Sequence, residues 1–121
     1  MAGKLCKITK DTEYVVDPPH HEKTIAYPLV NPKACPGAQM EFHITEISKD
    51  GCATVDVHPE EDHVFYIISG RATAKVGDEE FLCEPGDALW VPKNTEHDFN
   101  PVGGETLRLG VFFAPPRDIW G

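Results

Sequence analysis

Two stretches of the chain place histidines and a carboxylate at spacings that suit a metal ion. Asp56 and His58 are two residues apart, and side chains two apart in a strand point to the same face. The polar segment 59–62 is short enough to turn the chain and to bring His63 beside them at the start of the next strand. If His97 enters from a neighbouring strand, the set contains three imidazoles and one carboxylate. Such a mixed set of nitrogen and oxygen donors suits Fe, Mn, Ni, Cu or Zn better than Mg or Ca.

Each of these residues also has an ordinary structural explanation. His58 precedes a proline in a charged turn and could be an exposed loop residue, whereas His63 could be a core histidine bonded to a backbone carbonyl. His97 lies between two acidic residues, as in a solvated bend. Asp56 could simply end a strand. The residue types and spacings leave these alternatives open.

The spacing resembles the first motif of the cupin family, which is usually G-x5-H-x-H-x3–4-E-x6-G. Counting back from Gly70, six intervening residues lead to His63, at the position of the glutamate. Four more lead to His58, at the second histidine, and Asp56 then takes the position of the first histidine. The carboxylate and one imidazole have thus exchanged positions. Because aspartate is short, Asp56 either reaches the metal or orients an imidazole or a bound water.

The second cupin motif, usually G-x5-P-x-G-x2-H-x3-N, has a counterpart further along the chain. Gly86 is followed after five residues by Pro92, and His97 stands at the histidine position. Pro101 replaces the usual asparagine. The resemblance covers roughly residues 35–115. It implies an all-β fold, a cupin-type antiparallel β-barrel or jelly roll, and one divalent transition metal ion held by Asp56 and the three histidines, with Fe, Zn, Mn, Ni and Cu all open.

Glycine, proline and Asn-type turn signals separate short runs rich in Val, Ile, Phe and Thr, a pattern typical of an all-β sandwich or barrel. The predicted strands are 39–47, 53–58, 63–69, 71–76, 79–83, 88–91, 96–99 and 106–113. No segment predicts a helix. The run 64–68 is apolar on both faces, which predicts a strand covered on both sides, by the barrel interior and by a second sheet or a partner subunit.

Prolines and polar residues interrupt the first 34 residues, which predict an N-terminal arm in the same domain as a barrel over residues 35–121. Small cupins often pair through N-terminal strands, so the resemblance implies a homodimer contact there. His20 and His21 are expected at the surface. Trp120 is expected to pack against the barrel or to cover its mouth.

Composition restricts the possible partners. The net charge of −9 on 121 residues argues against nucleic-acid binding, which needs a basic stripe. No apolar run approaches the ~20 residues that cross a bilayer, and the first residues lack a secretory signal, so we expect a cytoplasmic protein without a membrane partner.

A site of this kind binds a small-molecule substrate through chelating oxygens. With Fe(II) it would hold the substrate against O₂, and an Fe(II) dioxygenase is the first expectation. With Zn or Mn it would favour an enolate, and hence a lyase, isomerase or cyclase. A non-catalytic module that binds a ligand or metal is the third possibility. Non-redox chemistry needs an acid or base, for which His43 and Glu41 are candidates if their face of the strand lines the cavity.

Overall fold

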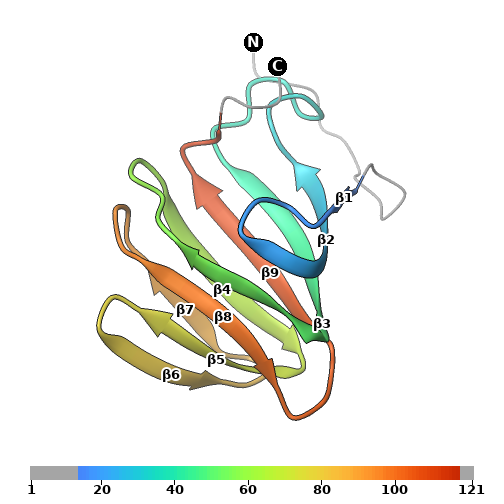
Figure 1. Ribbon diagram of the computed structural model, residues 1–121. Coiled ribbons are helices and arrows are strands. Elements are labelled where there is room, and N and C mark those ends of the chain that lie inside the picture. Colours follow the sequence, from blue (N-terminus) through green and yellow to red (C-terminus); the bar gives the residue numbers. More distant parts are fainter. Residues whose placement is uncertain (1–13, 118–121) are drawn as a thin grey trace.

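The computed structural model describes residues 14–117, and these contain strands but no helix. The strands are β1 (Val15–Val16), β2 (His21–Val30), β3 (Glu41–Asp56), β4 (Asp62–Ser69), β5 (Arg71–Val76), β6 (Glu79–Cys83), β7 (Ala88–Val91), β8 (His97–Val102) and β9 (Leu107–Ala114) (Figure 1). The predicted all-β class is therefore confirmed. Over the same residues, there is no helix of the length and apolarity that spanning a membrane would require.

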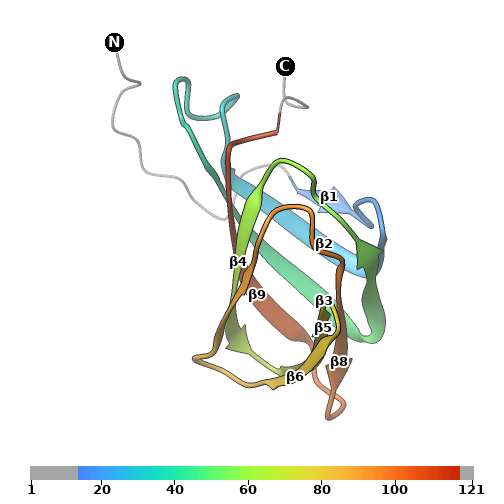
Figure 2. The same ribbon diagram turned by 90° about the vertical axis from the view of Figure 1, so that its left-hand side faces the viewer.

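All strand pairs are antiparallel, and they form one curled sheet in the order β6-β5-β8-β3-β9-β4-β7. The long strand β3 belongs to both halves of this sheet. Its first half pairs with β9 from Glu41 to Ile47, and its last residues pair with β8 between Ala53 and Asp56. Strand β2 lies along the opposite edge of β3, as Figure 2 shows, and β1 pairs with β2.

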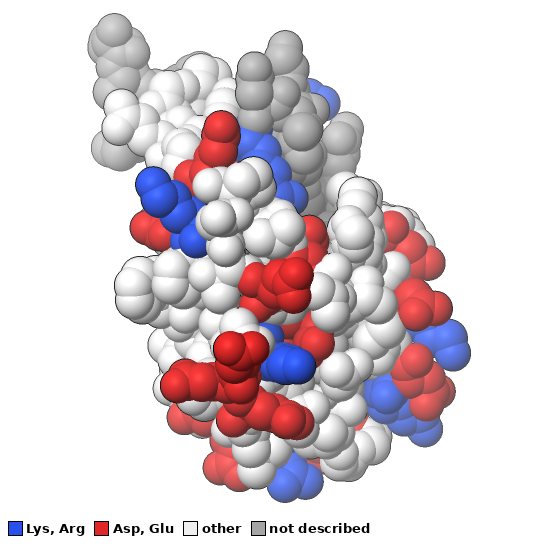
Figure 3. Space-filling model, turned by 60° about the vertical axis from the view of Figure 1, so that its left-hand side comes forward, with Lys and Arg blue, Asp and Glu red and all other residues white. Residues whose placement is uncertain are grey.

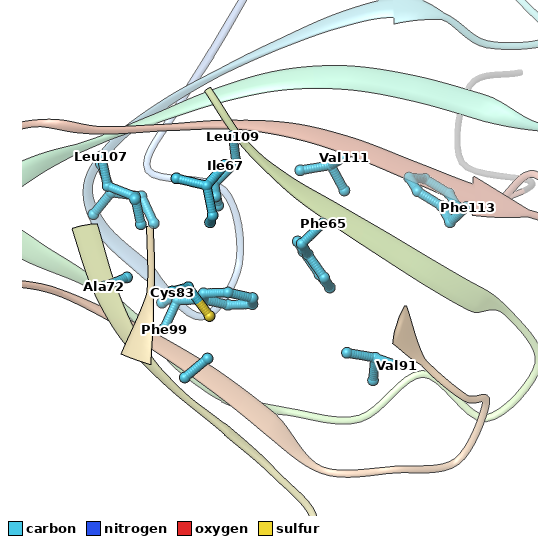
Figure 4. Packing of buried hydrophobic residues seen from close by; sticks show 13 residues of the cluster. Phe65, Ile67, Ala72, Cys83, Val91, Phe99, Leu107, Leu109, Val111 and Phe113 are labelled. Carbon is cyan, nitrogen blue, oxygen red and sulfur yellow. The ribbon is translucent and has the colours of Figure 1, made fainter. Parts of the chain in front are cut away.

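The core lies on the concave side of the sheet, where alternate residues of each strand meet. In β4 the side chains of His63, Phe65 and Ile67 are buried, whereas Tyr66 is exposed. Figure 4 shows Phe65 and Ile67 packed with side chains of β9 and with Phe99 of β8. Because side chains alternate between the two faces of a strand, only every second residue can point into the interior. Because His63 is in phase with the core residues of β4, it is held at one end of the core.

One prediction about strands is wrong. The segments 39–47 and 53–58 were expected as two strands separated near Gly51, but β3 is continuous through it and is bulged where its pairing changes. Strand 64–68 was expected to be covered by the barrel interior on one side and by a second sheet or a partner subunit on the other. Within the described residues Tyr66 is 49 % exposed on the outer side, and cover by a partner subunit stays a prediction. The curled sheet is an open barrel, since β6 and β7 at the two ends of the described sheet are not paired with each other.

The predicted N-terminal arm, 1–34, is described from residue 14 onward. Its strand β2 pairs with β3 over most of its length, from His21 to Val30, so this part of the arm extends the barrel sheet. Its role as a dimer contact stays a prediction, and Trp120 lies outside the described residues. On the face drawn in Figure 3, acidic and basic side chains both occur, and the basic ones form no continuous stripe.

The turn between β4 and β5 gives a test of the fold. Gly70 has φ +79°, and a Cβ added there would lie 2.4 Å from the carbonyl oxygen of Thr106. Gly104 has a similar φ of +75°, but nothing lies within 4 Å of its added Cβ. We expect Gly70→Ala to lower the free energy of unfolding by more than ~2 kcal/mol, and Gly104→Ala by ~1 kcal/mol, the cost of the left-handed backbone alone. Urea unfolding of both variants measures this, and equal losses would contradict the close packing at Gly70.

Candidate metal centre and cavity

A cavity of about 210 Å³ opens on the concave side of the sheet. One wall comes from β3 and β9, and another from β1, β2 and the turn between them. Its apolar lining includes Ile47, Phe65, Phe99, Leu109, Val111 and Phe113. Asp56, His58, His63 and His97 line the same cavity. The structure thus brings all four predicted ligand candidates to one apolar, partly enclosed space.

The three imidazoles lie against one another. The ring centroids of His58 and His63 are 4.2 Å apart, those of His58 and His97 are 5.1 Å apart, and those of His63 and His97 are 6.0 Å apart. His63 and His97 are buried, with 3 % and 6 % of their surface exposed. A grouping of three histidines from three different segments is what the spacing predicted.

Strand pairing positions three of the four residues directly. Asp56 and His97 are partners in the β3–β8 register, and His63, near the start of β4, lies opposite Val91 of β7. The prediction that Asp56 and His58 share one strand is wrong, because β3 ends at Asp56 and His58 lies in the following loop.

The loop that carries His58 is held by the turn of the second motif. The backbone N–H of Asn94 donates to the carbonyl of His58 at 2.7 Å. Asn94 has φ +61°, a conformation that asparagine tolerates better than most residues, and it stands where the cupin motif usually has glycine. The two motifs, far apart in sequence, are therefore joined at the site by a backbone hydrogen bond.

The imidazoles of His58 and His63 are kept neutral by their surroundings. Burial lowers the pKa of His63 to about 3, and repulsion from His58, when that ring is protonated, and from the Arg117 guanidinium acts in the same direction. Burial and the Arg117 guanidinium lower the pKa of His58 to about 4, against the opposing effect of Asp56. At neutral pH both rings therefore have a lone pair available for a cation.

The Nδ1 atoms of His97 and His63 differ in their hydrogen-bond partners. Nδ1 of His97 lies 3.1 Å from the carbonyl of Thr95, so the tautomer that donates this hydrogen bond leaves Nε2 with its lone pair. Nδ1 of His63 is buried and has no hydrogen-bond partner among the described residues. A buried ring nitrogen without a partner is costly, and a metal ion or a polar group of a ligand in the cavity would satisfy it.

Arg117 is a site residue that the sequence did not single out. Its Nη2 contacts both ring nitrogens of His58, at 3.0 Å from Nε2, and its Nε donates to Glu61 Oε1 at 2.7 Å. The guanidinium carbon also lies 5.0 Å from the centre of the Phe113 ring. The chain after β9 thus brings a fixed positive charge to the histidines. Its sequence signal, an arginine after two prolines, is too common to have identified it.

Asp56 faces the cavity but is already partly engaged. Its Oδ1 accepts a hydrogen bond from the backbone N–H of Val57 at 2.8 Å, and its Oδ2 lies 3.5 Å from Nε2 of His58. His20, which is exposed as expected, lies 3.9 Å from the same carboxylate. The short side chain therefore lies beside His58, in a position to orient that ring.

His43 and Glu41, the predicted acid–base candidates, form a pair. His43 lines the cavity from β3, and its Nε2 is 2.9 Å from Oε1 of the fully buried Glu41. Glu41 lies behind His43 and also accepts a hydrogen bond from the backbone N–H of Arg117 at 2.7 Å. Burial lowers the pKa of His43, in spite of the carboxylate beside it. The polar phase of this strand therefore faces the cavity, with the imidazole in front of the carboxylate.

His21, which was expected on the surface, is half-buried at the mouth of the cavity. It lines the cavity from the start of β2, and its Nδ1 is 2.8 Å from the carbonyl of Pro19. Burial lowers its pKa. The two adjacent prolines made this segment resemble an exposed loop, whereas pairing of β2 with β3 folds it over the cavity.

Comparison with known proteins agrees with this geometry. The cupin domain model matches residues 43–113, which contain all four ligand candidates. The chain belongs to the cupin family.

Among known proteins, this cupin is 25 % identical over 112 residues to protein MJ1618 of Methanocaldococcus jannaschii, covering 91 % of this chain and 89 % of the relative. It is 38 % identical over 57 residues to protein SCO3923 of Streptomyces coelicolor; this match covers 47 % of the present chain and about half, 53 %, of the Streptomyces protein. The polyketide cyclase RemF from Streptomyces resistomycificus has a similar structure, with a TM-score of 0.80 at 20 % identity, over 95 % of this chain and 82 % of RemF. This last similarity shows the fold.

The donors of this cupin fit a transition metal in kind. Three imidazoles, one of them with an unpartnered buried nitrogen, and a neighbouring carboxylate form a set of nitrogen and oxygen donors. Within residues 14–117, however, no three His, Cys, Asp or Glu side chains are already placed as a ligand group. The His58 and His63 rings are stacked at 20° and Arg117 lies against His58, so binding requires these rings to turn and the guanidinium to move.

The depressed pKa values predict how the metal-free protein responds to acid. Between the ordinary histidine pKa of 6.5 and a value of about 3, His63 takes up a proton when unfolded but not when folded. The free energy of unfolding should therefore fall as the pH falls through this range, by up to ~1.4 kcal/mol per pH unit for this group.

Chemical unfolding at several pH values with a chelator present measures this slope. His63→Gln should make the slope shallower, and His20→Gln, at an exposed imidazole, is the matched control and should resemble the wild type. A slope that is identical in the wild type and in His63→Gln would contradict the neutral, buried state of His63.

Proposed function

We propose that this cupin is an enzyme that binds one divalent transition metal ion through His58, His63 and His97 and acts on a small oxygenated substrate. The observation that supports this most directly is the grouping of three imidazoles, within 4.2–6.0 Å of one another, on the wall of an apolar cavity. The bound metal would act as a Lewis acid toward a carbonyl or hydroxyl oxygen of the substrate. A cavity of about 210 Å³ limits the substrate to a small molecule or to one end of a larger one.

The His43–Glu41 pair favours proton-transfer chemistry, as in a lyase, isomerase or cyclase. Because Glu41 Oε1 accepts from Nε2 of His43, the other ring nitrogen is the basic atom of this imidazole. A neutral histidine on the cavity wall can take a proton from a carbon beside a carbonyl group, and the buried carboxylate stabilises the imidazolium that forms. The similarity of fold to a polyketide cyclase is compatible with this class.

An Fe(II) dioxygenase is the second candidate. Three imidazoles with few other ligands leave coordination positions for a chelating substrate and for O₂, and the mainly apolar lining excludes water from a reactive intermediate. Elemental analysis of protein purified without added metal separates the two candidates, since iron supports the dioxygenase and zinc or manganese supports proton-transfer chemistry.

Metal content tests the proposal. The wild type is expected to bind one metal ion per chain, and His97→Ala should reduce the bound metal strongly because one of three imidazoles is lost. His43→Gln is the matched control, because His43 lies on the cavity wall but is paired with Glu41 outside the cluster, and it should retain the metal. Unchanged metal content in both His97→Ala and His58→Ala would disprove the assignment.

The role of Asp56 can be separated from that of the histidines. Since one carboxylate oxygen accepts from Val57 and the other lies beside His58, we expect Asp56 to orient His58 rather than to bind the metal. Asp56→Ala should then keep the metal but weaken its affinity by ~10- to 100-fold. X-ray absorption spectra of wild type and variant should show the same inner ligands. Loss of an oxygen scatterer at roughly 2.0–2.2 Å would instead make Asp56 a ligand.

A further inference from the structure

Arg117 lines the cavity with two donor nitrogens that no carboxylate of the described residues accepts. Glu61 accepts a hydrogen bond only from Nε of the guanidinium, at 2.7 Å. Nη2 lies against the imidazole of His58, and Nη1 has no hydrogen-bond partner within residues 14–117. A guanidinium commonly uses this pair of nitrogens for two parallel hydrogen bonds to one carboxylate. Arg117 therefore has donors for a second carboxylate, which the described part of the chain does not supply.

The contact between Arg117 and His58 is a weak use of these donors. Nη2 lies close to both Nδ1 and Nε2 of the ring. The in-plane directions in which these two ring atoms form hydrogen bonds diverge, so one nitrogen cannot bond well to both. The ring is also neutral at pH 7, because burial lowers its pKa to about 4. An anionic carboxylate would be a better partner for the guanidinium.

The ring of Phe113 brings the guanidinium close to the groups that the proposed chemistry uses. The guanidinium carbon of Arg117 lies 5.0 Å from the centre of this ring. The His63 ring stacks on Phe113 at 4.8 Å, and the His43 ring meets it edge-on at 5.2 Å. Arg117, His43 and His63 all line the cavity. A ligand of a few carbon atoms that is bound to Arg117 at one end can therefore reach both His43 and the grouped histidines.

The side chain of Arg117 can turn while its backbone stays in place. Its backbone N–H donates to Oε2 of the fully buried Glu41 at 2.7 Å, which ties this residue to β3. The side chain, by contrast, is 33 % exposed. Rotation about its side-chain bonds would move Nη1 and Nη2 away from His58 without loss of the backbone hydrogen bond.

The charges of the cavity make a cation and a carboxylate bind better together than alone. Near the histidines, Glu41, Asp56 and Glu61 supply three negative formal charges against the one positive charge of Arg117. A carboxylate that enters the metal-free cavity meets this negative excess, and a cation that binds at His58 meets the guanidinium. When both are present, the cation offsets the negative excess and the guanidinium can turn to the carboxylate. Each ligand thus makes binding of the other more favourable.

We propose that Arg117 binds a carboxylate group of the substrate, and that metal and carboxylate bind cooperatively because both require Arg117 to leave His58. This inference rests on the metal site proposed above. It assigns the substrate to the small oxo or hydroxy carboxylic acids. The carboxylate lies at Arg117, a carbonyl or hydroxyl oxygen faces the histidines, and the carbon between them lies beside His43. The apolar lining, which includes Phe65 and Val111, suits the hydrocarbon part of such an acid.

Isothermal titration calorimetry of the full chain with benzoate tests the proposal, with Zn²⁺ bound and after removal of metal by a chelator. The wild type should bind benzoate at least ~5-fold more tightly with Zn²⁺ than without it, as is usual for two coupled sites. Arg117→Gln should weaken benzoate binding to the Zn²⁺ form by at least ~10-fold, because hydrogen bonds to a charged group are lost. The same variant should bind Zn²⁺ more tightly than the wild type, by ~3-fold or more, because a like charge is removed from beside His58.

Benzamide and Arg108→Gln are the matched controls. Benzamide has the same ring without the charge, and it should bind equally to the wild type and to Arg117→Gln. Arg108 is also paired with a glutamate, Glu46, at 3.5 Å, but it lies outside the cavity lining, so Arg108→Gln should bind benzoate like the wild type.

Circular dichroism and a thermal melt show whether each variant is folded. If Arg117→Gln does not fold, Arg117→Lys decides the result, because lysine keeps the positive charge but cannot donate two parallel hydrogen bonds. Arg117→Lys should weaken benzoate binding by ~3-fold or more.

The role of Arg117 and the metal site fail in different ways. A wild type that binds Zn²⁺ but binds benzoate no better than the folded Arg117 variant overturns the role of Arg117 and leaves the metal site standing. An equal loss of benzamide binding also overturns it, since Arg117 would then only maintain the shape of the cavity. Equal benzoate affinity with and without Zn²⁺ overturns the cooperativity. A wild type that binds no Zn²⁺ instead disproves the metal site, and the cooperativity with it.

Discussion

The structure depends on the hydrogen bonding of one strand, β3, to three others. Along one edge β3 pairs first with β9 and then, after a bulge, with β8, and along its other edge it pairs with β2. Because every backbone group of a buried strand needs a partner, the change from β9 to β8 forces the sheet to curl rather than to end. The curl creates the concave side, and the same strand carries His43 on one wall and Asp56 beside the histidines. Without this shared strand there would be two small sheets and no cavity.

The cavity combines an apolar lining with polar imidazole rings. The apolar lining determines the protonation state of the rings and therefore whether they can bind a cation. Burial makes the charged forms of His58 and His63 unfavourable, so the rings stay neutral. Neutral rings can lie together at 4.2 Å without repulsion, as charged rings could not. The same apolar surroundings that stabilise the core through burial of Phe65, Phe99 and Phe113 thus keep imidazole lone pairs available.

The sequence predicted the structure correctly where the alternation of side chains along a strand, or a residue in a turn, determines it. The alternation in β4 placed His63, Phe65 and Ile67 on one face, and the two motifs brought His58, His63 and His97 into one cavity. It was less informative about residues whose position depends on long-range pairing. Nothing local shows that β3 continues through Gly51, and nothing near Arg117 indicates a contact with His58. His21 was assigned to the surface because the strand that covers the cavity pairs with a segment about 30 residues away.

The charges around the histidines are compatible with the proposed binding of a divalent cation. Apart from the imidazoles, the formal charges nearby are one positive, from Arg117, and three negative, from Glu41, Asp56 and Glu61, which sum to −2. A divalent cation would bring this sum to zero. Arg117, which now lies against His58, would be repelled by such a cation but would stay bound to Glu61 through its Nε. Arg117 now lies beside Phe113 on the cavity wall, and if the proposed metal binds, its guanidinium would supply a positive charge for a carboxylate or enolate oxygen of a substrate.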